Sequence, residues 1–140
     1  MSTDNAAAPA ALEQFVAIMP FAGALGIELT AASPEQVVGT MSWAPERCTA
    51  GGVLHGGAIM AFADTVGAVC AILNLPEGAT TATISSSTNM LRAVRGGEVT
   101  ATARRLHAGR STITVQTELR DDDGRLVAQV TQAQAVLAGR

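Results

Sequence analysis

The sequence contains no lysine and no tyrosine, and aromatic residues make up only 3 % of its 140 positions. All nine basic residues are arginine, they form no basic tract, and the net charge is −3, which argues against a nucleic-acid-binding protein. Cys48 and Cys70 are too few for a disulfide framework, and they predict a reduced, cytoplasmic chain. Because hydrophobic residues account for 48 % of the sequence, the predicted core consists of Ala, Val, Ile, Leu and Met.

Targeting and metal-binding signals are missing as well. Residues 1–9 lack the basic start and the apolar stretch of a signal peptide. Residues 1–19 are predicted to be a leader and a short helix over 10–18 that ends at Pro20, followed by one domain over 20–140. No His/Cys cluster indicates a metal site, and the acidic run 121–123 is typical of a solvated turn.

Charge is nearly absent from residues 55–73, where Asp64 is the only charged side chain. Burying an unpaired carboxylate costs several kcal/mol, so such a group is usually paired, protonated or functional. A membrane span is the less favoured alternative, because a mid-span Asp is expensive and basic flanking residues are missing. We therefore predict a buried helix over 54–75 in which Asp64 is either catalytic or a structural hydrogen-bonding group.

Alternation with period two predicts strands on both sides of this helix. Two short strands come before it and four longer ones after it, over residues 25–32, 36–43, 80–91, 98–107, 111–120 and 125–137. The order α-β-β-α-β-β-β-β predicts an α+β fold in which a long central helix is wrapped by a curved antiparallel β-sheet.

The segment Gly52-Val-Leu-His55-Gly56-Gly57, with Asp64 seven residues after the second glycine, resembles the signature of hotdog-fold acyl-CoA thioesterases. The phenylacetate-pathway and 4-hydroxybenzoyl-CoA thioesterases are the most similar branch. The resemblance covers roughly residues 20–137. It implies the hotdog fold, an acyl-CoA substrate without a further cofactor, and a homodimer or a dimer of dimers.

The resemblance also implies roles for individual residues. The residue at Gly56 offers its backbone N–H to the thioester oxygen, Asp64 acts as a nucleophile or as a general base for water, and Thr83 helps to place that water. The family usually has Asn six residues before the His, where this chain has Thr49. A hydroxyl at that position could still orient a water molecule.

Helix geometry leads to a prediction about the assembly. Gly56 and Asp64 are eight residues apart, which is about 12 Å along a helix. Reacting groups must come within about 3–3.5 Å of the thioester centre. We therefore expect Asp64 of one subunit to act with Gly56 of its partner across a two-fold axis.

Further candidates concern the substrate. Gly57 lets a substrate approach the backbone closely, while Met60, Phe62 and Met90 are candidates for the acyl pocket. His55 is expected to position the turn before the helix rather than to catalyse. The phosphates of coenzyme A need cationic partners. The candidates are Arg92, Arg95, Arg104, Arg105 and Arg110. Each of these arginines could instead be an ordinary solvated surface residue.

Two other functions stay open from the sequence. A hotdog-fold hydratase or dehydratase would use a His base with an Asp, and His55 lies where it could serve. A non-catalytic acyl-CoA-binding module is the other alternative, and Thr49 in place of Asn raises it slightly. The helix-borne Asp64 favours hydrolysis.

Overall fold

The computed structural model describes residues 6–139. Two short helices, α1 (Pro9–Ala17) and α2 (Pro20–Ala24), precede the strands β1 (Glu28–Ala32) and β2 (Gln36–Ser42). A 3-10 turn, η2 (Pro45–Arg47), leads to the long helix α3 (Gly56–Ile72). Four strands complete the chain: β3 (Thr80–Met90), β4 (Glu98–Ala108), β5 (Thr112–Arg120) and β6 (Leu126–Leu137).

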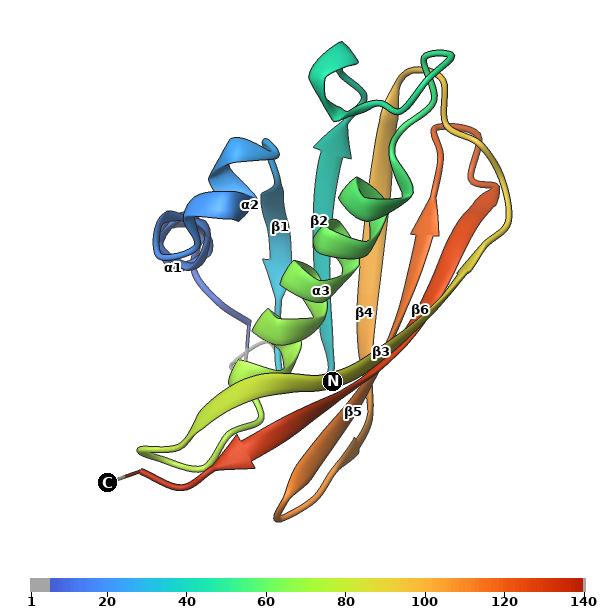
Figure 1. Cartoon of the computed structure of the whole chain (residues 1–140). Helices are drawn as coiled ribbons and strands as arrows, with labels where there is room; N and C mark the ends of the chain where they lie inside the picture. Colours follow the sequence, from blue (N-terminus) through green and yellow to red (C-terminus); the bar gives the residue numbers. More distant parts are fainter. Residues whose placement is uncertain (1–5, 140) are drawn as a thin grey trace.

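The six strands form one antiparallel sheet in the order β1-β2-β4-β5-β6-β3. Helix α3 lies across one face of the sheet (Figure 1) and contacts all six strands. This confirms the predicted combination of one long helix with an antiparallel sheet. Strands β1 and β3 are the two edges, so β3 pairs only with β6 within the described residues.

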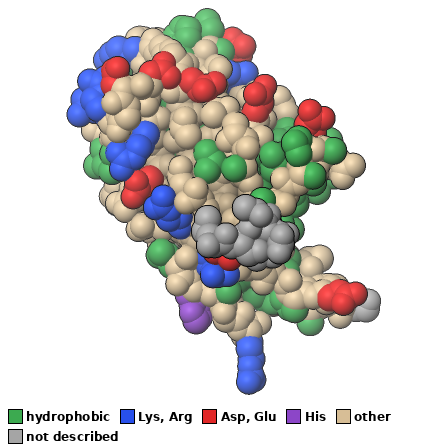
Figure 2. Space-filling model, turned by 180° about the vertical axis from the view of Figure 1, so that it is seen from behind, with side chains coloured by type: hydrophobic (Ala, Val, Ile, Leu, Met, Phe, Trp, Pro, Cys, Tyr) green, Lys and Arg blue, Asp and Glu red, His purple; other side chains and the backbone are tan. Residues whose placement is uncertain are grey.

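The core lies between α3 and the sheet and contains almost no aromatic side chains. Phe62 is its largest fully buried residue, and it packs among aliphatic side chains such as Met41, Val66 and Ile113. The opposite side of the molecule, seen in Figure 2, presents mainly uncharged polar side chains and backbone, with charged side chains most frequent at its upper left and others along its top and right side. The strands therefore follow the inside-outside alternation expected of a sheet with one covered face.

Most predicted elements are confirmed, with boundaries that differ by a few residues. The central helix is shorter than predicted because His55 caps its start and Leu73 its end. The short helix predicted over 10–18 is α1, and its Leu12 is buried in the common core rather than separate from the domain. Of the predicted leader, residues 1–5 lie outside the described residues.

The segment after Pro20 was predicted wrongly. Pro20 ends the first helix, but it also begins α2, because proline fits the first helical position, where its missing N–H is not needed. The following strand consequently begins at Glu28 instead of residue 25. In the described part of the chain, no helix is both long and apolar enough to cross a membrane.

Candidate active site

Asp64 lies on α3 with its side chain directed toward β3 and β6. Its Oδ1 accepts a hydrogen bond of 2.8 Å from the Thr83 hydroxyl and one of 3.1 Å from Nε2 of Gln132. The residue is half-buried, and within residues 6–139 it makes no salt bridge. The carboxylate is thus held by neutral donors alone, which orient it without neutralising its charge.

A second layer of hydrogen bonds supports Thr83. Nε2 of Gln134 donates to the Thr83 hydroxyl at 2.8 Å, and the Thr81 hydroxyl lies 3.2 Å from Oε1 of Gln134. Gln132 and Gln134 are almost completely inaccessible to solvent, with relative exposures of 1 % and 0 %. Sequence reasoning missed both glutamines. Their spacing was the available signal, because they alternate in phase with the buried Val130 on the inward face of β6.

A β-bulge in β3 places Thr83 beside this network. Thr83 is opposite Gln134 and Ser85 is opposite Ala133, so the intervening Ile84 has no partner on β6. The extra residue shifts the alternation of β3 by one position. Thr83 before the bulge and Thr88 after it therefore lie opposite inward-facing residues of β6.

The start of α3 is built by His55, as predicted. Its Nδ1 accepts a hydrogen bond of 2.7 Å from the backbone N–H of Gly57, so His55 is the N-cap of the helix. A Cβ at Gly57 would lie 2.9 Å from that Nδ1, which explains the glycine. The Gly57 N–H is thus used by the cap, and the expectation that Gly57 lets a substrate approach the backbone closely stays a prediction.

Gly56 differs from its neighbour. Its N–H has no hydrogen-bond acceptor among the described residues, and it lies at the positive end of the α3 dipole. A pocket of about 370 Å³ opens beside it. Its lining is mainly aliphatic, with Arg92 as the one charged side chain; it comprises Val53, Leu54, Gly56, Ile59, Met90, Leu91, Arg92, Ala93 and Val94.

The predicted acyl-pocket residues divide between surface and core. Met60 and Met90 are 44 % and 45 % exposed, and Met90 approaches Gly56 closely enough that a Cβ there would lie 3.3 Å from its methyl group. Phe62 is fully buried in the core. Within one subunit it does not line the pocket beside Gly56, and its assignment to the acyl pocket stays a prediction.

The remaining predicted residues are more scattered. Thr49 is exposed in the turn before α3, where its N–H bonds the carbonyl of Val53. Arg95 reaches the carbonyl of Gly51 at 3.4 Å. Arg110 lies in the turn between β4 and β5, at the far end of these strands from the loop that carries Arg95. Within one subunit, the candidate phosphate-binding arginines therefore do not form a single group.

Two further arginines have intramolecular partners. Nε of Arg104 lies 3.2 Å from Oε1 of Gln36, and Arg105 donates to Oδ1 of Asn74 at 2.8 Å. Cys70 is buried nearby, and burial raises the pKa of its thiol to about 11 against the opposing influence of Arg105. The cysteine is thus a neutral core residue at physiological pH.

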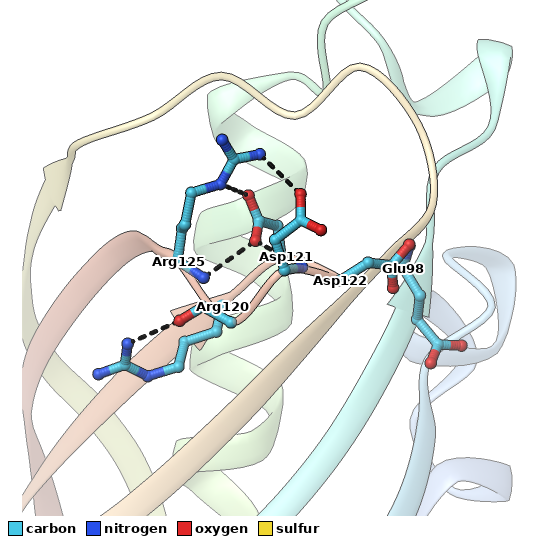
Figure 3. A network of polar contacts seen from close by, with 7 residues as sticks. Glu98, Arg120, Asp121, Asp122 and Arg125 are labelled. Atoms are coloured by element: carbon cyan, nitrogen blue, oxygen red, sulfur yellow. Dashed lines mark hydrogen bonds and ion pairs between the residues drawn. The ribbon is translucent and has the colours of Figure 1, made fainter.

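The acidic run 121–123 forms a turn held mainly by its own residues (Figure 3), and Oδ2 of Asp122 also accepts a hydrogen bond of 3.3 Å from the backbone N–H of Glu98. Oδ1 of Asp121 accepts from the backbone N–H groups of Asp123 and Arg125 at 3.0 Å each, and its Oδ2 pairs with Nε of Arg125 at 3.1 Å. Arg125 also reaches Asp123 at 3.0 Å. Among residues 6–139, no group of three or more His, Cys, Asp and Glu side chains is arranged to hold a metal ion.

Comparison with known proteins identifies the family. A model of the family described as "Thioesterase superfamily" matches residues 51–128, a stretch that includes α3 with Asp64 and the strands β3, β4 and β5. The chain belongs to the thioesterase superfamily. It is therefore a thioester hydrolase. The match confirms, at the level of the superfamily, the resemblance seen in the sequence.

Solved thioesterases of the superfamily share the fold closely. The thioesterase HI1161 from Haemophilus influenzae superposes with a TM-score of 0.87 at 30 % identity, covering 94 % of this chain and 92 % of that one. A mutant of the thioesterase PA1618 from Pseudomonas aeruginosa gives a TM-score of 0.85 at 30 % identity, covering 90 % and 93 %. The proofreading thioesterase EntH of Cronobacter turicensis is 32 % identical over 101 residues, which are 72 % of this chain and 74 % of that protein.

Proposed function

We propose that this thioesterase hydrolyses a small, medium-length or aromatic acyl-CoA to the free acid and coenzyme A. The observation that carries the proposal is the half-buried Asp64 carboxylate, which is oriented by neutral donors and has no cationic partner in the described chain. Such a carboxylate keeps its negative charge free for nucleophilic attack or for deprotonating water. The thioesterases that resemble this chain support the same reaction class.

The reaction assigned to the site adds water across the carbonyl and breaks the carbon–sulfur bond. Asp64 either attacks the carbonyl carbon itself or removes a proton from the attacking water. The negative charge that develops on the carbonyl oxygen is stabilised by the Gly56 N–H, a donor that is fixed before the reaction begins. The thiolate then leaves without needing a strong acid. If Asp64 was the nucleophile, water hydrolyses the mixed anhydride that remains; if it was the base, its proton passes to the thiolate or to solvent, and in both cases the carboxylate is regenerated.

Two subunits are needed for this chemistry. Gly56 and Asp64 stand on the same helix and are separated by about 12 Å along its axis. Asp64 is also absent from the lining of the pocket beside Gly56. We therefore assign the Gly56 pocket of one subunit to the Asp64 of its partner, and the proposed enzyme is a homodimer or a dimer of dimers.

Strand β3 is the edge that suits such a dimer. It carries Thr83, pairs on one side only, and exposes Ile84 by 59 % without any charged residue between Thr80 and Met90. A long, uncharged and partly apolar edge is a template for pairing with another strand. Pairing two copies of β3 would bring the two Asp64 networks close to the dimer axis.

The pocket beside Gly56 suggests how coenzyme A would bind. Arg92 lines the pocket and is the first candidate for a phosphate contact, with Arg95 on the same loop as the second. Arg110 lies at the other end of the sheet, so it would serve a site only through another subunit. The partly exposed side chains of Met60 and Met90 are candidates for contact with the acyl chain.

The alternative of a hydratase or dehydratase is weakened by one contact. A His base needs a free lone pair, but the Nδ1 lone pair of His55 accepts the N–H of Gly57. In the neutral ring the other nitrogen then carries the proton and can only donate. Measuring crotonyl-CoA hydration beside thiol release distinguishes the two reactions, and ligand binding without either activity would indicate a binding module.

The test of the oxyanion role uses two substitutions at Gly56. Gly56→Pro removes the N–H at the first helical position, where proline is tolerated, and the preceding His55 already has the extended conformation that proline requires. Gly56→Ala keeps the N–H and is the matched control. We expect thiol release from an acyl-CoA panel to fall by about 10²–10³-fold for the proline variant alone.

The shared site is tested by mixing subunits. Neither the Gly56→Pro chain nor the Asp64→Asn chain should be active alone, but a mixture of the two would form heterodimers with one intact site. Recovery of up to about a quarter of the wild-type activity is expected from random exchange between equal amounts, as two-fold symmetry implies. If exchange is verified by mass spectrometry and no activity returns, the two-subunit site is wrong.

A further inference from the structure

The two oxygens of the Asp64 carboxylate are not equivalent. Oδ1 accepts both hydrogen bonds, from Thr83 at 2.8 Å and from Gln132 at 3.1 Å. Oδ2 has no hydrogen-bond partner among the described residues. A carboxylate held through one oxygen has its plane and direction fixed, while the other oxygen keeps its lone pairs free.

Gln132 occupies its position at a cost to stability. Its Oε1 is buried and has no hydrogen-bond donor within the described chain. An unsatisfied buried oxygen of this kind costs about 1–3 kcal/mol, so an apolar side chain of similar size would suit the fold better. Among residues 6–139, the one hydrogen bond that the Gln132 amide makes to another side chain is the bond to Asp64.

Helix α3 makes room for this amide through Gly67. A Cβ at Gly67 would overlap Oε1 of Gln132 and would lie 2.6 Å from its Cδ. Gly67 is one helical turn from Asp64 on the same helix, and glycine within a helix costs roughly 0.5–1 kcal/mol relative to alanine. Two separately unfavourable choices, a buried glutamine and a mid-helix glycine, therefore have one common result: an N–H directed at Oδ1 of Asp64.

We propose that Gln132 is a positioning residue which, together with Thr83, binds Oδ1 of Asp64 and leaves Oδ2 as the oxygen that attacks the thioester or takes the proton of water. Gly67 is part of the device because it provides the space for the amide. The proposal rests on the hydrolase function proposed for Asp64. It adds a specific oxygen to that function and two residues that sequence reasoning did not select.

The test is a kinetic comparison of Gln132→Met, Gly67→Ala and a control. Methionine fills the space of glutamine without the N–H, and alanine displaces the amide from the other side. The control is Thr117→Val, which removes another fully buried polar group whose hydroxyl has no partner in the described chain. We expect kcat to fall by about 10–100-fold in the first two variants, as misorientation of a reacting group does, and to change less than about twofold in the control.

Further readouts separate positioning from general damage to the fold. KM should change by less than about threefold, because the substrate does not contact the amide. Thermal unfolding should show Gln132→Met to be at least as stable as wild type, since its unsatisfied oxygen is gone. In an Asp64→Asn background, Gln132→Met should cause no additional loss of activity, which is the coupling expected of a residue that acts through Asp64.

The outcomes distinguish this inference from the proposed function. A wild-type chain that releases no thiol from any acyl-CoA would contradict the proposed function. A wild type that is active, an Asp64→Asn variant that is inactive, and a Gln132→Met variant within about twofold of wild type would overturn the positioning role alone. Should Gln132→Met fail to fold, Gly67→Ala decides by the same criteria.

Discussion

Asp64 and Asp121 are both held by hydrogen bonds, but in opposite ways. Asp121 uses both oxygens, accepts two backbone N–H groups, and pairs with the guanidinium of Arg125 (Figure 3). Asp64 uses one oxygen, accepts only from neutral side chains, and has no cation beside it in the described chain. A fully compensated carboxylate stabilises a turn, whereas a carboxylate that is oriented but not compensated remains able to react.

The hydrogen bonds of Asp121 also shift its pKa. Burial acts to raise this pKa, but the N–H groups of Arg125 and Asp123 and the Arg125 charge outweigh it, so the pKa lies below its usual value. The folded turn therefore favours the charged carboxylate. The hydrogen-bond partners of Asp121 all lie within four residues of it, so the stabilisation that Asp121 provides does not depend on the site on α3.

The largest difference in activity is expected between variants that neutralise one carboxylate or the other. Asp64→Asn should lower kcat by about 10²–10⁴-fold, the usual contribution of a general base or nucleophile. Asp121→Asn removes a charge of the same kind and should leave kcat within about twofold of wild type. Free thiol released from acyl-CoA substrates is the measurement. If kcat falls by less than about tenfold in Asp64→Asn, Asp64 is not the central catalytic group.

An intermediate effect is expected from Thr83→Val, which keeps the shape of the side chain and removes its hydroxyl. Asp64 then loses the shorter of its two hydrogen bonds, and Gln134 loses an acceptor. We expect kcat to fall by about tenfold, equivalent to about 1.4 kcal/mol of barrier. Thr83→Ser, which keeps the hydroxyl, should retain most of the activity, and equal losses in both variants would argue against a hydrogen-bonding role.

The smallest effect concerns stability in acid. Because the folded pKa of Asp121 is depressed, the turn contributes stability above the unfolded pKa of about 4 and loses it as the pH falls through the folded value. Arg125→Met should therefore lower the urea midpoint slightly at neutral pH and hardly at all near pH ~2. A difference between variant and wild type that stays constant across this range would exclude the charge as its cause.

Much of the fold could be predicted because the hydrophobic patterns are strong and simple. The apolar run around Asp64 indicated one buried helix, and alternation in the following segments indicated four long strands. The error at Pro20 has a local cause, since proline both ends one helix and suits the first position of the next. The pairing order, with β3 beyond β6, depends on contacts that no single segment encodes.

The site could be predicted only where one residue stood out against its surroundings. Asp64 was conspicuous as a lone charge, and Thr83 was selected through the family resemblance. Gln132 and Gln134 were overlooked because polar residues in a strand are normally assigned to the solvent side. Their phase with Val130 was the one signal of an inward orientation, but the mixture of apolar and polar residues along β6 left it ambiguous until the register with β3 and β5 was known.

Ile84 gives β3 an unusual tolerance to a change in length. Because it has no partner on β6, deleting it would leave every other pairing of the strand intact and keep Thr83 opposite Gln134. Deleting Ala82 instead would absorb the bulge, turn the Thr83 hydroxyl outward and present the isoleucine to the Asp64 carboxylate. The chain without Ile84 would thus keep its polar network. The chain without Ala82 would have a hydrocarbon side chain in place of the Thr83 hydroxyl.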